Sequence, residues 1–208
     1  MGSDDLFKKA KALREFRRRV GTKGRERARI LIVCEGEKTE PNYFEGFRLT
    51  NVTVKGTGYN TDSLVQKALL LKATAIRDKE KYDQVWCVFD RDRFSAESFN
   101  SAFILAQDHD IKVAYSNEAF ELWYLLHFNY YDTALSRDQY IIKLSQLLGH
   151  PYCKNSTSTF DELFDRQNDA IRNAKYLLDQ YTELNPEKDN PSTTVHVLVE
   201  ELREWTKH

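Results

Sequence analysis

Three acidic residues stand directly after strongly apolar segments of the chain. Glu35 follows the segment 29–34, whereas Asp90 and Asp92 follow the segment 85–89. Such apolar segments are typical of strands that are covered on both faces, and in an open parallel sheet ligands bind outside the carboxyl ends of the strands. If the two strands are neighbours, we expect the three carboxylates to converge.

Converging carboxylates favour a hard metal ion. They repel one another at pH 7 unless a cation lies between them, and oxygen ligands favour Mg²⁺ or Mn²⁺ over zinc. A Mg²⁺ with few protein ligands keeps positions for water and phosphate oxygens, as phosphodiester chemistry requires. We therefore predict that Glu35, Asp90 and Asp92 are catalytic residues that hold Mg²⁺ (or Mn²⁺). The alternative is that acids near strand ends only support helix N-termini, as Glu37 and Glu40 could do.

The elements that must position these acids alternate between strands and helices. Four segments predict strands, at 29–34, 51–55, 85–89 and 111–115. Helical patterns follow the first three, at 41–49, 62–76 and 95–108. Because each strand is followed by a helix, the crossovers are expected to be right-handed and the sheet parallel.

After residue 116 the patterns are helical. They occupy 117–126, 136–148, 160–181 and a segment that begins at 191. The sequence thus predicts an α/β fold, with a four-stranded parallel sheet flanked by helices and a C-terminal all-helical extension. We expect the α/β domain to span residues 28–116 and the extension, residues 117–208, to pack on it.

The charge of the chain is unevenly spread. Residues 1–29 carry eleven Lys or Arg against four acids, a net charge of +7, so the remaining residues sum to −8. We expect residues 1–27 to form a basic arm with a helix. A basic arm on an acidic body suggests contact with a polyanion such as nucleic acid, and the alternative is a solubilising tail.

Composition excludes several classes of protein. The chain of 208 residues suits one compact domain, and no apolar run approaches the roughly 18 residues of a membrane helix. No apolar signal-peptide core follows the N-terminus. Three cysteines without close spacing argue against a disulfide framework and a zinc site. We expect a cytoplasmic protein without a membrane partner.

Motifs within these segments resemble a known fold and a known family. The runs Ile-Val-Cys-Glu-Gly at 32–36 and Val-Phe-Asp-Arg-Asp at 88–92, in this order of strands and helices, resemble a Toprim domain, the fold shared by topoisomerases, primases and OLD-family nucleases. The run Cys-Glu-Gly-Glu-Lys-Thr-Glu-Pro-Asn-Tyr-Phe at 34–44 more closely resembles the RloB family (RloB-like or AbiL-type abortive-infection proteins), together with 117–123 and 125–128. That resemblance extends from about residue 25 to the end.

The resemblance implies roles for the acids. Glu35 would act as general acid or base or as a metal contact, and Asp90 and Asp92 would hold Mg²⁺. OLD-type nucleases use a second Glu soon after the first, and Glu40 is the candidate metal ligand here, one residue further along than in the usual pattern. RloB-like proteins are linked to bacterial restriction and abortive-infection loci, beside a partner ATPase of the AAA or ABC type.

The leading hypothesis is therefore a metal-dependent nuclease of the Toprim/OLD type that acts on DNA or RNA in phage defence. Four polar residues near the acids are candidates for substrate binding, namely Lys38, Arg91, Glu118 and Glu121. Lys38 could stabilise phosphate charge. Glu118 and Glu121 are one helical turn apart and would share a helix face. His127 is expected to be structural rather than catalytic.

Two other functions remain open. The chain could be a non-catalytic regulatory or nucleic-acid-binding module of a defence complex, in which the carboxylates are structural. It could also be a phosphotransferase with Asp90 as nucleophile. Arg93 and Phe94 argue against this class, which has Thr or Val two residues past the second Asp. The sequence leaves open whether the chain forms a homo-oligomer.

Overall fold

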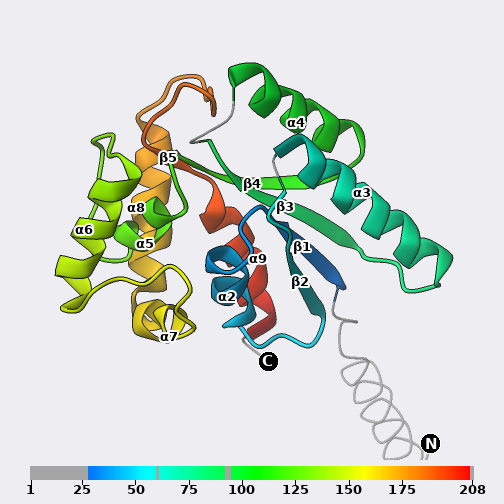
Figure 1. Ribbon diagram of the computed structural model, residues 1–208, viewed down its shortest axis with the longest axis horizontal. Coiled ribbons are helices and arrows are strands. Elements are labelled where there is room, and N and C mark those ends of the chain that lie inside the picture. Colours follow the sequence, from blue (N-terminus) through cyan, green and yellow to red (C-terminus); the bar gives the residue numbers. More distant parts are fainter. Residues whose placement is uncertain (1–27, 60, 92–94, 207–208) are drawn as a thin grey trace, which may run out of the picture.

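The computed structural model describes residues 28–59, 61–91 and 95–206. The basic arm predicted at 1–27 and the candidate ligand Asp92 lie outside these residues. Within them, five strands form one mixed sheet in the order β2-β1-β3-β4-β5 (Figure 1). The strands are β1 (Ile30–Cys34), β2 (Val52–Gly56), β3 (Gln84–Asp90), β4 (Lys112–Asn117) and β5 (Ser192–Thr193).

The four longer strands are mutually parallel, so the α/β class and the four predicted strands are confirmed. The intervening helices are α2 (Thr39–Glu45), α3 (Thr61–Arg77) and α4 (Ala96–Asp108). The side chain of Ser95 caps α4 by accepting a hydrogen bond from the backbone of Ser98. β1 lies between β2 and β3, and its last residue, Cys34, is in register with Val88. The ends of β1 and β3 therefore lie side by side.

The expected four-stranded sheet with an all-helical extension is wrong at β5. This two-residue strand pairs antiparallel with β4, with Thr193 opposite Ser116. The hydroxyl of Thr193 also donates a hydrogen bond to the backbone oxygen of Tyr115 at 2.9 Å. Two residues are too few to show the alternation of apolar and polar side chains from which a strand is predicted. This strand forms because of its contacts with β4, which is distant in sequence.

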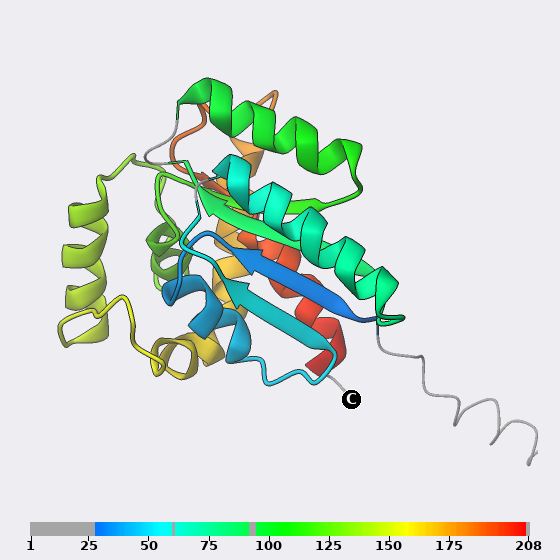
Figure 2. The same cartoon turned by 45° about the vertical axis from the view of Figure 1, so that its right-hand side comes forward.

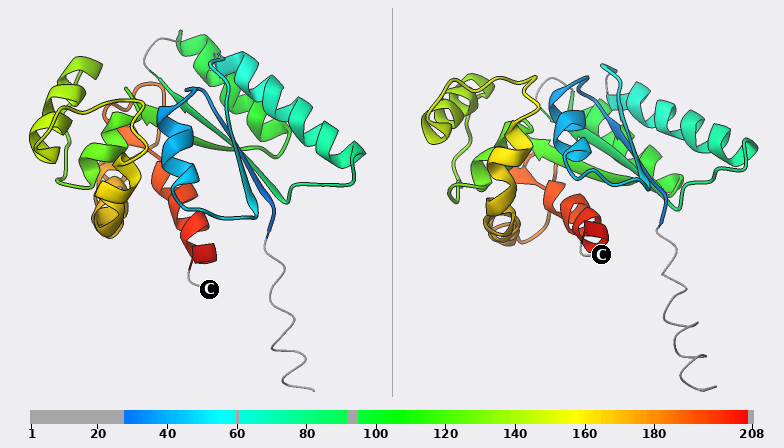
Figure 3. Two further views of the ribbon diagram at one scale, coloured as in Figure 1. Left: turned by 60° about the horizontal axis from the view of Figure 1, so that its bottom comes forward. Right: turned by 90° about the horizontal axis from the view of Figure 1, so that it is seen from below.

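The sheet has a hydrophobic core on each face, which explains why β1 and the middle of β3 are apolar throughout. Ile30 and Ile32 belong to the core beneath α2 and the last helix, α9 (Val195–Thr206), whereas Leu31 and Val33 belong to the core beneath α3 and α4. Figure 3 shows these two pairs of helices on opposite sides of the sheet. Within the part of the chain that the structure describes, none of the helices has the length and apolar character needed to cross a membrane.

The remaining helices gather beyond the carboxyl ends of the parallel strands. In Figure 2 the arrows of β1 and β2 run toward the side on which α6 lies. These helices are α5 (Glu121–Leu126), α6 (Arg137–Leu148), α7 (Thr159–Leu163) and α8 (Gln167–Asp179). A short 3-10 helix separates α7 from α8, so the continuous helix predicted at 160–181 is wrong.

Tertiary contacts explain this break. Phe160 in α7 packs against α2, so closely that a Cβ added at Gly46 would overlap its ring. In contrast, α8 packs against α5. The two segments thus bury their apolar faces against different partners. Because β5 and α9 belong to the sheet and its core, the C-terminal part contributes to the same fold, and the domain boundary at residue 117 stays a prediction.

Candidate active site

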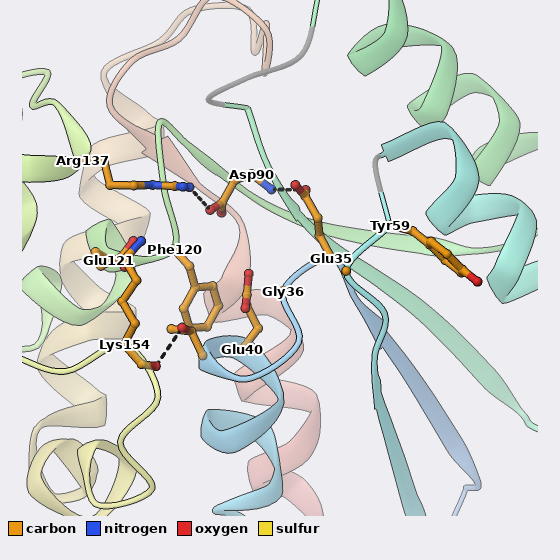
Figure 4. Close-up of a pocket in the computed structure, with 11 residues that line it drawn as sticks. Glu35, Gly36, Glu40, Tyr59, Asp90, Phe120, Glu121, Arg137 and Lys154 are labelled. Atoms are coloured by element: carbon orange, nitrogen blue, oxygen red, sulfur yellow. Dashed lines mark hydrogen bonds and ion pairs between the residues drawn. The ribbon is translucent and has the colours of Figure 1, made fainter.

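Two of the predicted acids meet at the carboxyl edge of the sheet. The backbone amide of Glu35 donates a hydrogen bond to the backbone oxygen of Val88 at 2.9 Å, which continues the β1–β3 pairing beyond the strand. The side chain of Glu35 turns toward β3, where its Oε2 accepts a hydrogen bond from the backbone amide of Asp90 at 3.2 Å (Figure 4). Glu35 and Asp90 are therefore neighbours through a contact between side chain and backbone, while the carboxylate of Asp90 turns toward Arg137 (Figure 4).

A cavity of about 410 Å³ opens over this pair. Its walls come from the loops after β1 and β2, the end of β3, and the helices and loop of the C-terminal part. The lining residues are Glu35, Gly36, Thr39, Glu40, Gly58, Tyr59, Asp90, Phe120, Glu121, Arg137 and Lys154. The cavity thus combines four carboxylates with two cationic side chains.

Glu40 enters the cavity from the first turn of α2 and is buried. Its carboxylate lies over Gly36, where a Cβ would overlap the Glu40 Oε2. Burial raises the pKa of Glu40, while hydrogen bonds from its own backbone amide and that of Gly36 act in the opposite direction. The glycine after Glu35 is therefore required by the close approach of a second carboxylate.

Asp90 is buried close to the other acids of the cavity. Burial raises its pKa well above the ordinary value, and the charges of Glu40, Glu121 and Glu35 raise it further. The guanidinium of Arg137 lowers it, through a 3.2 Å contact between Arg137 Nη2 and Asp90 Oδ2. Even with this ion pair the negative charge is in excess, so additional positive charge would stabilise the ionised cluster.

A second ion pair lies on the same side of the cavity as Arg137 (Figure 4). Lys154 Nζ is 3.2 Å from Glu121 Oε1, and the hydroxyl of Tyr152 donates a hydrogen bond to the same oxygen at 3.4 Å. Neither cation of the cavity was predicted from the sequence. Arg137 had one usable signal, because a basic residue in the first turn of a helix opposes the helix dipole. Lys154 stands in the irregular segment between α6 and α7, which carries no comparable signal.

The candidates for substrate binding separate into three places. Glu121 lines the main cavity, while Lys38 is exposed and does not line it. Arg91 and Glu118 instead line a neighbouring cavity of about 290 Å³, where Arg91 pairs with Glu187 at 3.3 Å.

The expectation that Glu118 and Glu121 share a helix face is wrong. β4 continues through Asn117 and α5 begins only at Glu121, so Glu118 lies in the turn between them. His127 follows α5 and is fully buried, with its Nδ1 2.9 Å from the backbone oxygen of Trp123. This is the structural position expected for His127.

The donor atoms of the cavity suit a hard cation. All of its acidic side chains offer carboxylate oxygens, the ligand type that Mg²⁺ and Mn²⁺ prefer. Within residues 28–59, 61–91 and 95–206, no group of three or more His, Cys, Asp or Glu side chains is arranged to hold a metal ion. Glu35 and Asp90 offer the type of ligand atom that such an ion prefers. The third predicted ligand, Asp92, lies outside the described residues.

Comparisons with known proteins add one positive finding. A family model described as RloB-like protein matches residues 30–202, a range that includes every residue lining the main cavity. Neither the curated proteins nor the solved structures gave a significant match.

Proposed function

Because this chain belongs to the RloB-like family, we propose that it is a metal-dependent nuclease of the Toprim/OLD type that acts on DNA or RNA in bacterial phage defence. A partner ATPase of the same defence locus is part of this proposal. The observation that carries it is the meeting of Glu35 and Asp90 at the ends of adjacent parallel strands, inside an open cavity with further carboxylates.

The proposed reaction is hydrolysis of a phosphodiester. A water oxygen bonds to phosphorus while the bond from phosphorus to one ester oxygen breaks. Glu35, oriented by the amide of Asp90, accepts the proton of the water, and the leaving oxygen takes a proton from solvent. Asp90 and Asp92, with Glu40 as a further candidate, would hold Mg²⁺, which when bound neutralises phosphate charge.

A cleavage assay tests the proposal directly. Purified protein is incubated with plasmid DNA and with transfer RNA in Mg²⁺ or Mn²⁺, alone and with its partner ATPase. We expect metal-dependent cleavage, and we expect Glu35→Gln and Asp90→Asn each to lower its rate by about 100-fold or more, since each removes a group that contacts the reacting atoms.

Two acid-to-amide variants serve as matched controls. Glu45 lies on α2 with Glu40 but is exposed, and Asp108 is exposed at the end of α4. Glu45→Gln and Asp108→Asn should therefore cleave at the wild-type rate. Cleavage that persists in both site variants, or that never appears with either metal, would contradict the proposal.

The second candidate function is a non-catalytic module of a defence complex. It is favoured by the two ion pairs, because Arg137 and Lys154 already supply positive charge to Asp90 and Glu121. The two functions differ in a phage-protection assay with the complete locus. Loss of protection in Asp90→Asn supports the nuclease, whereas full protection supports the module. The phosphotransferase is disfavoured, because Phe94 stands two residues past the second Asp, where that class has Thr or Val.

A further inference from the structure

Arg137 occupies an unusual position for a basic residue. It is the first residue of α6, where the positive end of the helix dipole disfavours a cation. The capping box formed by Ser136 and Gln139 holds this helix end, so Arg137 is not needed as a cap. Its side chain instead reaches across the cavity to Asp90, which stands at the end of β3 (Figure 4).

The ion pair joins a buried acid to a more accessible base. The side chain of Asp90 is 9% exposed and that of Arg137 is 27% exposed. Arg137 is therefore the more exposed partner of the pair, whereas Asp90 is buried near the charges of Glu40, Glu121 and Glu35.

A guanidinium binds both phosphates and carboxylates. Its planar fork of N–H donors matches the oxygens of either group. A divalent cation carries twice the charge of Arg137 and would compete with it for the same Asp90 carboxylate. A phosphate oxygen within the same cavity would then compete for the guanidinium of Arg137.

From this arrangement we infer that Arg137 is a phosphodiester-binding residue and that its ion pair with Asp90 is a resting contact, which a divalent cation replaces. The inference rests on the proposed function and extends it. In the resting state Arg137 neutralises part of the acidic cluster, and with the cation present it binds a phosphate of the substrate. Metal binding and nucleic-acid binding are thereby coupled through one side chain.

The test measures Mn²⁺ binding by isothermal titration calorimetry, independently of cleavage. Arg137→Gln removes the competitor for Asp90, so its affinity for Mn²⁺ should rise by roughly fivefold to tenfold relative to wild type. Affinity for a fluorescein-labelled single-stranded DNA in Ca²⁺, measured by anisotropy, should fall by roughly tenfold, because a charge-assisted contact with phosphate is lost. The two affinities should move in opposite directions.

Two further variants separate this role from a structural one. Arg137→Lys keeps the charge and loses the fork, so its Mn²⁺ affinity should stay near wild type while its DNA affinity is intermediate. Arg172→Gln removes an exposed arginine–carboxylate pair with Asp169 in α8 and should change neither affinity. Thermal unfolding of each variant checks that it is folded.

The possible results distinguish the inference from the proposed function. If wild type and Arg137→Gln both fail to bind Mn²⁺, the metal-dependent function itself is refuted. If wild type binds Mn²⁺ and Arg137→Gln binds it equally or more weakly, the inference alone is refuted, because Arg137 then does not compete for Asp90. A fall in both affinities together would identify Arg137 as a structural residue and would also refute the inference.

Discussion

At the scale of single residues, Gly36 and Glu40 depend on each other. Glu40 is buried against the backbone of Gly36 and accepts a hydrogen bond from its amide. A Cβ at position 36 would occupy the space of the Glu40 carboxylate. The glycine that follows Glu35 is thus required for a steric reason. The group that requires it is the carboxylate of Glu40, five residues after Glu35.

Gly36→Ala should displace the Glu40 carboxylate. We expect it to lower the free energy of unfolding by about 1 to 3 kcal/mol, the usual cost of overpacking a buried site. Chemical denaturation measures the change, and the cleavage assay should show a parallel loss of rate.

The double variant Gly36→Ala/Glu40→Ala provides the control. Glu40→Ala removes the atoms that the new Cβ would meet, so the effects of the two substitutions on stability should be strongly non-additive. If the double variant is less stable than Gly36→Ala by the full cost of Glu40→Ala, the steric explanation is incorrect.

At the scale of elements, α6 delivers a cation to a site built mainly on the sheet. Its capping box holds the end that carries Arg137, while Gly149, at a φ of 77°, ends the helix in a left-handed conformation. Both ends are thus held by local chemistry, but only the first lies at the cavity. The two ends can therefore be perturbed separately.

Ser136→Ala should loosen the start of α6 at a cost of about 1 kcal/mol, because the N-terminal backbone amides lose their cap. We expect the weakened position of Arg137 to lower DNA affinity as well. Thermal unfolding and anisotropy measure the two effects.

Gly149→Ala is the matched control at the other end of the same helix. A left-handed alanine costs about 1 to 2 kcal/mol, and the position has open space around it. Its DNA affinity should equal that of wild type. An equal loss of DNA affinity in both variants would show that helix stability alone, and not the position of Arg137, governs binding.

At the scale of the whole molecule, the titration of two buried side chains, those of His127 and Asp90, changes the stability of the fold in opposite directions. Burial lowers the pKa of His127 to about 4, so its contribution is present above the ordinary histidine pKa of about 6.5 and is lost as the pH falls toward 4. Burial and neighbouring acids raise the pKa of Asp90. Its contribution is present below the ordinary carboxyl pKa of about 4 and is lost as the pH rises through the raised value.

Asp90→Asn should therefore stabilise the metal-free protein above neutral pH by about 1 kcal/mol, because it removes a buried charge that functional sites retain at a cost in stability. Denaturant unfolding in EDTA, from pH 4 to pH 8, measures the profile. The decline of stability toward pH 8 should be smaller in Asp90→Asn than in wild type.

His127→Gln acts as the opposite control. It should reduce the loss of stability between pH 6.5 and pH 4 and leave the decline of stability toward pH 8 unchanged. If the stability of Asp90→Asn has the same pH profile as that of wild type, Asp90 is not a buried acid with a raised pKa.

Local patterns in the sequence predicted a large part of this fold. The apolar segments at 29–34 and 85–89 identified the two central parallel strands, because a strand covered on both faces is apolar almost throughout, and shorter apolar patterns at 51–55 and 111–115 identified the strands beside them. The alternation of strands and helices then implied that Glu35 and Asp90 stand at one edge of the sheet. The order of strands and helices along the chain was sufficient for this, because a residue that directly follows a strand lies at the carboxyl end of that strand.

The other half of the cavity was decided by tertiary structure. Arg137 and Lys154 come from segments about fifty residues or more beyond Asp90, and their approach depends on how α5 to α8 pack beyond the sheet. The separation of Glu118 from Glu121 and the pairing of β5 with β4 depend on the same packing. A sequence pattern reports periodicity within one element, whereas these contacts arise between elements. The sequence by itself thus determined the strand-end acids, and the tertiary structure determined which cations face them.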